Sequence, residues 1–78
     1  MPYSPDLMAE LNILNLFNLS TTQEGIKVHK EASMGAIEAT MRLHAKGIIT
    51  QQDGGYLTPL GHEAAEHAQA LLRLLKTD

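Results

Sequence analysis

The sequence contains no cysteine, so it has no disulfide framework, no cysteine-based zinc site and no cysteine nucleophile. It also has no run near the roughly 20 apolar residues that span a bilayer. Its first residues lack the basic start and the uninterrupted apolar run of a secretory signal peptide. A chain of 78 residues suffices for one small domain. We therefore expect a soluble cytoplasmic protein with a single domain over residues 1–78 and no membrane contact.

Positive charge is scarce as well, because six lysines and arginines stand against nine aspartates and glutamates, for a net charge of −3. Nucleic-acid-binding domains are usually basic, so this total argues mildly against such a function. The cations are not evenly distributed, however. Four of the six lie in one quarter of the chain: Lys27, Lys30, Arg42 and Lys46. A local basic surface over this quarter therefore remains an expectation.

Capping residues and apolar periodicity predict four helices, over residues 5–18, 21–28, 33–46 and 59–75. A serine or threonine that can accept from the first amides precedes each range or is its first residue. Gly25 lies inside the second range, where a glycine costs about 1 kcal/mol relative to alanine. Either the sequence simply tolerates this cost, or the glycine allows a neighbouring helix to approach closely.

The segment between the last two helices predicts a β-hairpin. Glycine is the residue type that most often follows the end of a helix, and Gly47 stands where the third helix is predicted to end. Residues 48–50 are β-branched and favour extended structure. Asp53-Gly54, followed by Gly55, favours a primed two-residue turn, whose central residues have positive φ. Because an isolated hairpin is not stable in water, we expect it to pack on the helices.

This order of elements predicts a mainly α-helical chain with a small β-hairpin, arranged as a winged helix-turn-helix: three helices, a two-stranded wing over 48–58 and a C-terminal helix. Residues 43–49 (LHAKGII) and 53–61 (DGGYLTPLG) resemble the end of the recognition helix and the wing of bacterial winged-helix regulators. The whole chain, including residues 18–29 (NLSTTQEGIKVH), also resembles a family of short, uncharacterised bacterial proteins of similar length. Members of that family are described at most as candidate DNA-binding proteins, so this second resemblance implies a fold more than an activity.

The resemblance to regulators implies a transcriptional regulator in which helix 33–46 reads the major groove of duplex DNA and the wing 48–58 reaches the flanking backbone. Arg42 would donate to guanine, and Glu38 would accept from cytosine. The residues assigned to DNA are Lys27, Lys30, Ser33, Met34, Glu38, Arg42, Lys46, Gln51 and Gln52. The predicted wing carries an acid and no cation, unlike most DNA-binding wings. The alternative is therefore a winged-helix module for protein–protein interaction or dimerisation that does not bind DNA.

The first helix carries apolar residues on two flanks, which is more than a surface helix of a small monomer usually has. Either its own domain nearly envelops this helix, or its second flank meets another chain, and we favour the second. The fourth helix combines leucines with alanines that allow another helix to approach closely. We therefore expect a homodimer through these two helices, with the interface residues Ile13, Leu16, Phe17, Leu71, Leu72 and Leu75.

The run 62–67 (HEAAEH) superficially resembles the helix of zinc proteases. That motif needs histidines four residues apart so that both lie on one face, whereas these histidines are five apart. His62 and Glu66 have the four-residue spacing of an ordinary pair on a solvated helix face. We therefore expect no enzymatic activity, no metal and no cofactor, and no small-molecule ligand is evident.

Overall fold

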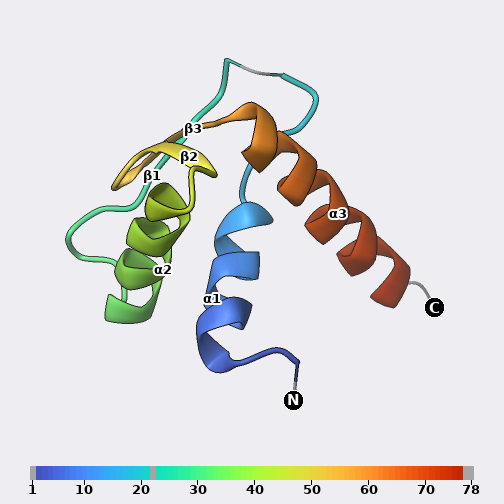
Figure 1. Ribbon diagram of the computed structural model, residues 1–78, viewed down its shortest axis with the longest axis horizontal. Coiled ribbons are helices and arrows are strands. Elements are labelled where there is room, and N and C mark those ends of the chain that lie inside the picture. Colours follow the sequence, from blue (N-terminus) through green and yellow to red (C-terminus); the bar gives the residue numbers. More distant parts are fainter. Residues whose placement is uncertain (1, 22, 77–78) are drawn as a thin grey trace.

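The computed structural model describes residues 2–21 and 23–76. Its elements are α1 (Pro5–Leu14), β1 (Ile26–Lys27), α2 (Met34–Ala45), β2 (Ile49–Gln51), β3 (Gly54–Leu57) and α3 (Pro59–Leu75). The strands form one antiparallel sheet in the order β1-β3-β2. Figure 1 shows α1 between α2 and α3, with the sheet at the C-terminal end of α2. The chain is thus mainly helical with a small sheet.

The predicted ranges of the last two helices are confirmed, because their ends are fixed by local signals. Ser33 and Thr58 are the N-caps of α2 and α3, and each side chain accepts from the amide three residues later, at 3.2 and 3.0 Å. Gly47 follows the C-cap of α2 with φ 77°. Its amide and the next one bond back to the carbonyls of residues 44 and 43, both at 3.0 Å. These two bonds form a Schellman motif, which ends α2 where the sequence predicts.

Thr58 also ties α3 to the end of α2. Its hydroxyl lies 2.6 Å from the carbonyl oxygen of Gly47 and 3.2 Å from that of Ile48. The Thr58 amide donates to the Ile48 carbonyl at 3.0 Å. A Cβ at Gly61 would fall on that same carbonyl, so the first turn of α3 lies directly against the strand that leaves α2.

The hairpin is confirmed, but its turn is not the predicted one. Residues 52–53 connect β2 to β3, and no described residue other than glycine has positive φ. Asp53 therefore lacks the conformation that a primed turn at Asp53-Gly54 requires. Positive φ occurs instead at Gly54 (130°) and Gly55 (76°), within β3, where the register with β2 shifts. A Cβ at Gly55 would fall on the hydroxyl of Thr50, so this position demands glycine on two grounds.

The predicted helix over residues 21–28 is wrong for the part that the structure describes; residue 22 lies outside the described residues. The segment contains β1, which pairs with β3. The amide of Gln23 bonds to the hydroxyl of Thr21 at 3.1 Å, so this side chain closes a local turn in place of a helix cap. A Cβ at Gly25 would fall on the carbonyl oxygen of Gly55. The glycine therefore permits close approach of a strand, not of a helix.

As a result, the described residues form three helices and three strands, where the sequence predicted four helices and two strands. α2 is preceded by β1 and a turn, so the described chain has no first helix of a helix-turn-helix pair immediately before α2.

α1 also ends at Leu14 and not near residue 18. Gln69 Nε2 of α3 donates to the carbonyls of Leu14 and Phe17, at 3.2 and 2.7 Å, which satisfies the backbone where α1 stops.

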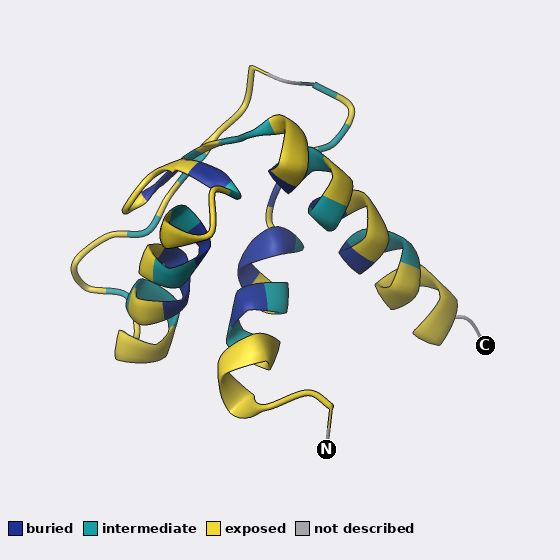
Figure 2. Cartoon of the chain, viewed as in Figure 1, coloured by how far each residue is buried: buried dark blue, intermediate teal, exposed yellow. Residues whose placement is uncertain are grey.

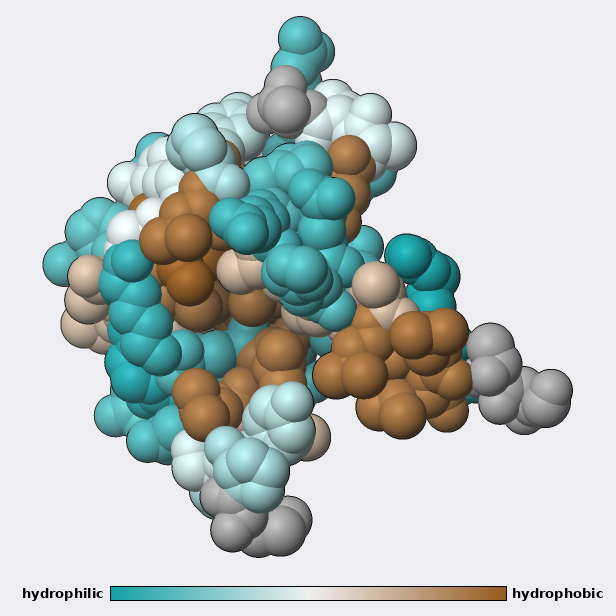
Figure 3. Space-filling view, turned by 45° about the vertical axis from the view of Figure 1, so that its right-hand side comes forward, coloured by the Kyte–Doolittle hydropathy of each residue, from teal (hydrophilic) through white to brown (hydrophobic). Residues whose placement is uncertain are grey.

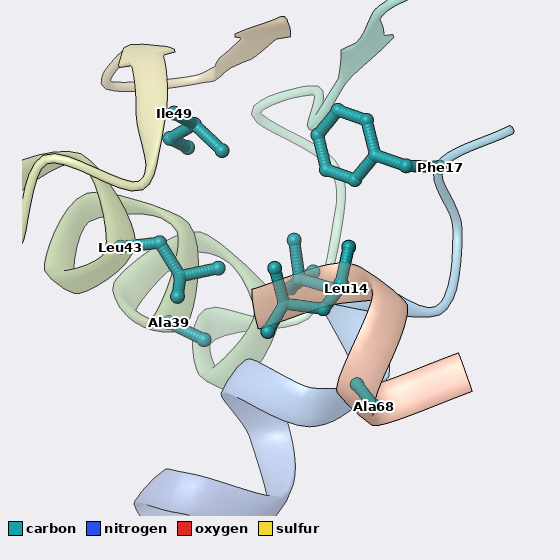
Figure 4. Packing of buried hydrophobic residues seen from close by; sticks show 8 residues of the cluster. Leu14, Phe17, Ala39, Leu43, Ile49 and Ala68 are labelled. Carbon is teal, nitrogen blue, oxygen red and sulfur yellow. The ribbon is translucent and has the colours of Figure 1, made fainter. Parts of the chain in front are cut away.

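The core lies where the three helices meet the sheet (Figure 2). Leu14 of α1 lies between Leu43 and Ala39 of α2 on one side and Ala68 of α3 on the other (Figure 4). The buried hydrophobic residues are Ile13, Leu14, Phe17, Ala39, Leu43, Ile49, Ala65 and Ala68. No helix in the described part of the chain is both long and apolar enough to cross a membrane.

Candidate interaction surfaces

Arg42 and Lys46, two of the residues assigned to DNA, contact α1. Arg42 Nε donates to Glu10 Oε2 at 2.9 Å, and Lys46 Nζ donates to Glu10 Oε1. Arg42 Nη2 also donates to the backbone oxygen of Asp6 at 3.2 Å. The Glu10 side chain is only 7% exposed. We call Glu10, Arg42 and Lys46 the α1–α2 charge cluster.

The cluster is charged at neutral pH. Burial by itself raises the pKa of Glu10, because the carboxylate loses hydration. Hydrogen bonds from Lys46 and Arg42, together with their charges, outweigh burial and hold the pKa of Glu10 below its ordinary value. The hydrogen bond with Glu10 in turn raises the pKa of Arg42. Both cations are thus committed to a carboxylate of the same chain.

Glu10 is missing from the residues predicted from the sequence, although the sequence contains a signal for it. At about 100° per residue, Glu10 falls between Ile13 and Leu14 in a helical projection of α1. A carboxylate within an apolar helix side needs a compensating cation. Arg42 on α2 and Lys46 at its C-cap are four residues apart, so one side of that helix and its end can supply two cations.

The other residues assigned to DNA do not form one surface. Ser33 is occupied as the N-cap of α2. Met34 and Glu38 are exposed on α2, and Gln51 is exposed on β2. Three of the assigned residues do lie together, around one groove: Lys27, Lys30 and Gln52.

This groove, which we call the α2 groove, lies between α2, the segment that follows β1, and the hairpin turn. Its volume is about 920 Å³. Its apolar lining consists of Val28, Ile37 and Met41. Its charged and titratable lining consists of Lys27, His29, Lys30, Glu31, His44 and Asp53. The groove thus combines an apolar strip with charges of both signs.

A second surface lies at the end of α3. The helix buries Gly61, Ala65 and Ala68. Beyond Ala68 the chain presents leucines that are 39–73% exposed: Leu71, Leu72, Leu74 and Leu75. Figure 3 shows the resulting apolar area beside the C-terminal residues drawn in grey. We call Leu71, Leu72 and Leu75 the α3 leucine end.

The predicted interface residues divide between the core and this surface. Ile13 and Phe17 are each 4% exposed and belong to the core of their own chain. Leu16 is 62% exposed, just after α1. The remaining three predicted residues form the α3 leucine end. Of the six predicted interface residues, those that a second chain can reach are therefore Leu16 and the three leucines of α3.

The run 62–67 lies on α3, among the residues that the structure describes. Within that part of the chain, no group of three or more histidine, aspartate, glutamate or cysteine side chains is placed to hold a metal ion. His62 Nδ1 lies 2.8 Å from Glu66 Oε1, which confirms the pair predicted from the four-residue spacing.

Comparison with curated proteins and with solved structures gives no match. A protein-family model does match, over residues 1–76, and its description is a family of unknown function. Because this match covers nearly the whole sequence, the chain belongs to the family of unknown function DUF5669.

Proposed function

We propose that the chain is a protein-interaction module on a reduced winged-helix scaffold and that it self-associates through the α3 leucine end. The observation that carries the proposal is the exposure of Leu71, Leu72 and Leu75, at 41, 39 and 73%. Contiguous apolar surface of this kind typically marks an interaction site on a small protein. A two-fold dimer brings the same patch of each copy together, so one apolar surface serves both.

The winged-helix part of the proposal is supported by element order. The β2–β3 hairpin directly follows α2, as a wing follows a recognition helix, and β1 completes a three-stranded sheet. The scaffold is reduced because β1 and a turn stand where a helix-turn-helix has its first helix.

Duplex DNA is the competing partner, and one observation favours it. Lys27 and Lys30 form no ion pair with any residue that the structure describes, so they are free to meet phosphates. Against it, Arg42 and Lys46 are held by Glu10. Phosphate neutralisation supplies most non-specific DNA affinity, and in an acidic chain the two lysines of the α2 groove supply little of it.

Analytical ultracentrifugation tests the self-association. We expect the wild type to be a dimer at high micromolar concentration and the double variant Leu71→Glu, Leu75→Glu to be a monomer with an unchanged circular dichroism spectrum. Met34→Glu is the matched control, because Met34 is 69% exposed on a different helix; it should remain a dimer. A wild type that sediments as a monomer at these concentrations would rule out self-association.

The DNA alternative is tested on the same preparations. Fluorescence anisotropy with a random-sequence duplex at low salt should give a Kd weaker than about 10⁻⁴ M, the weak end of non-specific binding. A tighter Kd that weakens steeply with salt, and that Lys27→Gln with Lys30→Gln abolishes, would assign the chain to DNA.

A further inference from the structure

α1 and α3 diverge toward the N-terminal end of α1 and the C-terminal end of α3 (Figure 1). On α1, Leu7, Leu11 and Leu14 lie on one side, because they are four and three residues apart. Exposure along this side rises from 6% at Leu14 to 39% at Leu7, with Leu11 half-buried between them. The N-terminal half of α1 therefore presents apolar side chains that its own chain leaves partly uncovered. We call Leu7 and Leu11 the α1 leucine side.

The inner side of α3 shows the same trend. Gly61, Ala65 and Ala68 are buried, and the same helical spacing continues in Leu72 and Leu75. Exposure along this side rises from 7% at Ala68 to 73% at Leu75. Figure 3 shows the result as two neighbouring apolar areas, one over the end of α3 and one over the N-terminal half of α1.

The α3 leucine end alone is small for a dimer interface. A buried aromatic side chain covers at most about 250 Å², and a leucine covers less. At exposures of 41, 39 and 73%, the three leucines therefore offer less than roughly 400 Å². A stable interface takes about 800 Å² from each partner, of which roughly 500 Å² is apolar. The proposed self-association thus needs further apolar surface, and the α1 leucine side is the apolar surface beside it.

We propose that the α3 leucine end of each copy packs on the α1 leucine side of the other copy. The inference rests on the proposed self-association and names the surface that receives the α3 leucine end. Two-fold symmetry forms this contact twice, because each copy supplies one projecting end and one receiving side. The patch that each copy contributes then comprises both surfaces. A contact between the two α3 leucine ends alone would leave the α1 leucine side in water, which is unfavourable for apolar surface.

Cross-linking tests which surfaces meet, since the wild-type chain has no cysteine. The single variants Leu7→Cys and Leu71→Cys replace residues that are 39% and 41% exposed. They are mixed in equal amounts, one with an affinity tag, equilibrated and treated with a short bis-maleimide. Random pairing makes the mixed product half of the cross-linked material. We expect the mixed product to exceed this half clearly, because the proposed contact joins the two positions only between unlike chains. Met34→Cys in place of Leu7→Cys is the control and should give no such excess.

A substitution on α1 gives an independent readout. Leu7→Glu places a charge in the receiving side and should weaken the dimer at least about 10-fold in Kd, measured by analytical ultracentrifugation. Leu16→Glu is the matched control, because Leu16 is 62% exposed just after α1 and outside the α1 leucine side. It should leave the Kd within about a factor of two. Both variants should keep the circular dichroism spectrum of the wild type.

The possible outcomes separate this inference from the proposed function. If the wild type is a dimer but Leu71→Cys cross-links mainly to itself, the interface consists of α3 ends alone. That result overturns this inference and keeps the proposed self-association. Equal Kd values for Leu7→Glu and Leu16→Glu would also overturn it. A wild type that is monomeric at high micromolar concentration refutes the self-association and, with it, this inference.

Discussion

Replacing Glu10 by glutamine isolates the energetic role of the α1–α2 charge cluster. The substitution keeps the size of the side chain and removes its charge. It also turns one oxygen acceptor into an NH₂ donor that faces Arg42 or Lys46. The Glu10 side chain is 7% exposed, so water cannot readily replace the lost interactions.

The size of the effect follows from burial. Breaking a buried ion pair by removing one partner costs about 3–5 kcal/mol. Arg42 and Lys46 are 33% and 47% exposed and can turn toward water, which lowers that figure. A hydrogen bond to a charged group contributes about 1.5–3 kcal/mol, so we expect Glu10→Gln to cost about 2–3 kcal/mol at neutral pH. For a domain of this size that corresponds to a fall in Tm of about 10–20 °C.

The loss should depend on pH in a defined direction. The pKa of Glu10 is lowered in the folded chain, so its charge stabilises the fold above the pKa of the unfolded chain. This stabilisation disappears as the pH falls through the folded pKa. The stability difference between wild type and Glu10→Gln should therefore be full at pH 6–7, should begin to shrink near the ordinary glutamate pKa of about 4.3 and should vanish only below the lowered pKa of folded Glu10.

Urea unfolding followed by circular dichroism at several pH values measures both quantities. Glu38→Gln is the matched control, because Glu38 is exposed on α2 and should change stability by less than about 0.5 kcal/mol. A loss below that value for Glu10→Gln at pH 7, or a difference between the two proteins that does not change with pH, would refute this account of the cluster.

Two further predictions concern glycines. Gly55→Val should destabilise the fold by about 2 kcal/mol or more, because Gly55 has φ 76° and its added Cβ would meet Thr50; an unchanged Tm would refute the assigned hairpin geometry. Gly25→Ala should also lower the Tm, since its Cβ would fall on the carbonyl of Gly55, whereas Gly35→Ala, where nothing lies within 4 Å, should raise stability by about 0.5–1 kcal/mol. Equal Tm values for these two alanine variants would contradict the close approach of the Gly25 segment to β3.

Features fixed by near neighbours in the sequence could be predicted from it. The bounds of α2 and α3 depend on a cap and a glycine within a few residues, and the hairpin depends on adjacent strands and a short turn. The segment around Gly25 could not be predicted, because it becomes a strand by pairing with β3, nearly 30 residues away. Its local capping signals are the same in a turn as in a helix.

The sequence likewise could not predict which groups the charged residues of the candidate site contact. Arg42 and Lys46 were predicted to face a polyanion, because periodicity gives their position on α2 but not the element that packs against it. Their partner, Glu10, lies 32 residues before Arg42 and on another helix. In contrast, Lys27, Lys30 and Gln52 lie around one groove, so that part of the predicted DNA-binding set does form a common surface.

The contacts of Thr58 and Gln69 hold α3 at two points along its length. The Thr58 hydroxyl contacts the carbonyls of Gly47 and Ile48 and caps the helix. The Gln69 amide, 11 residues or about 16 Å further along the helix axis, donates to the carbonyls of Leu14 and Phe17. The direction in which the α3 leucine end projects is therefore set by contacts with the ends of both α1 and α2.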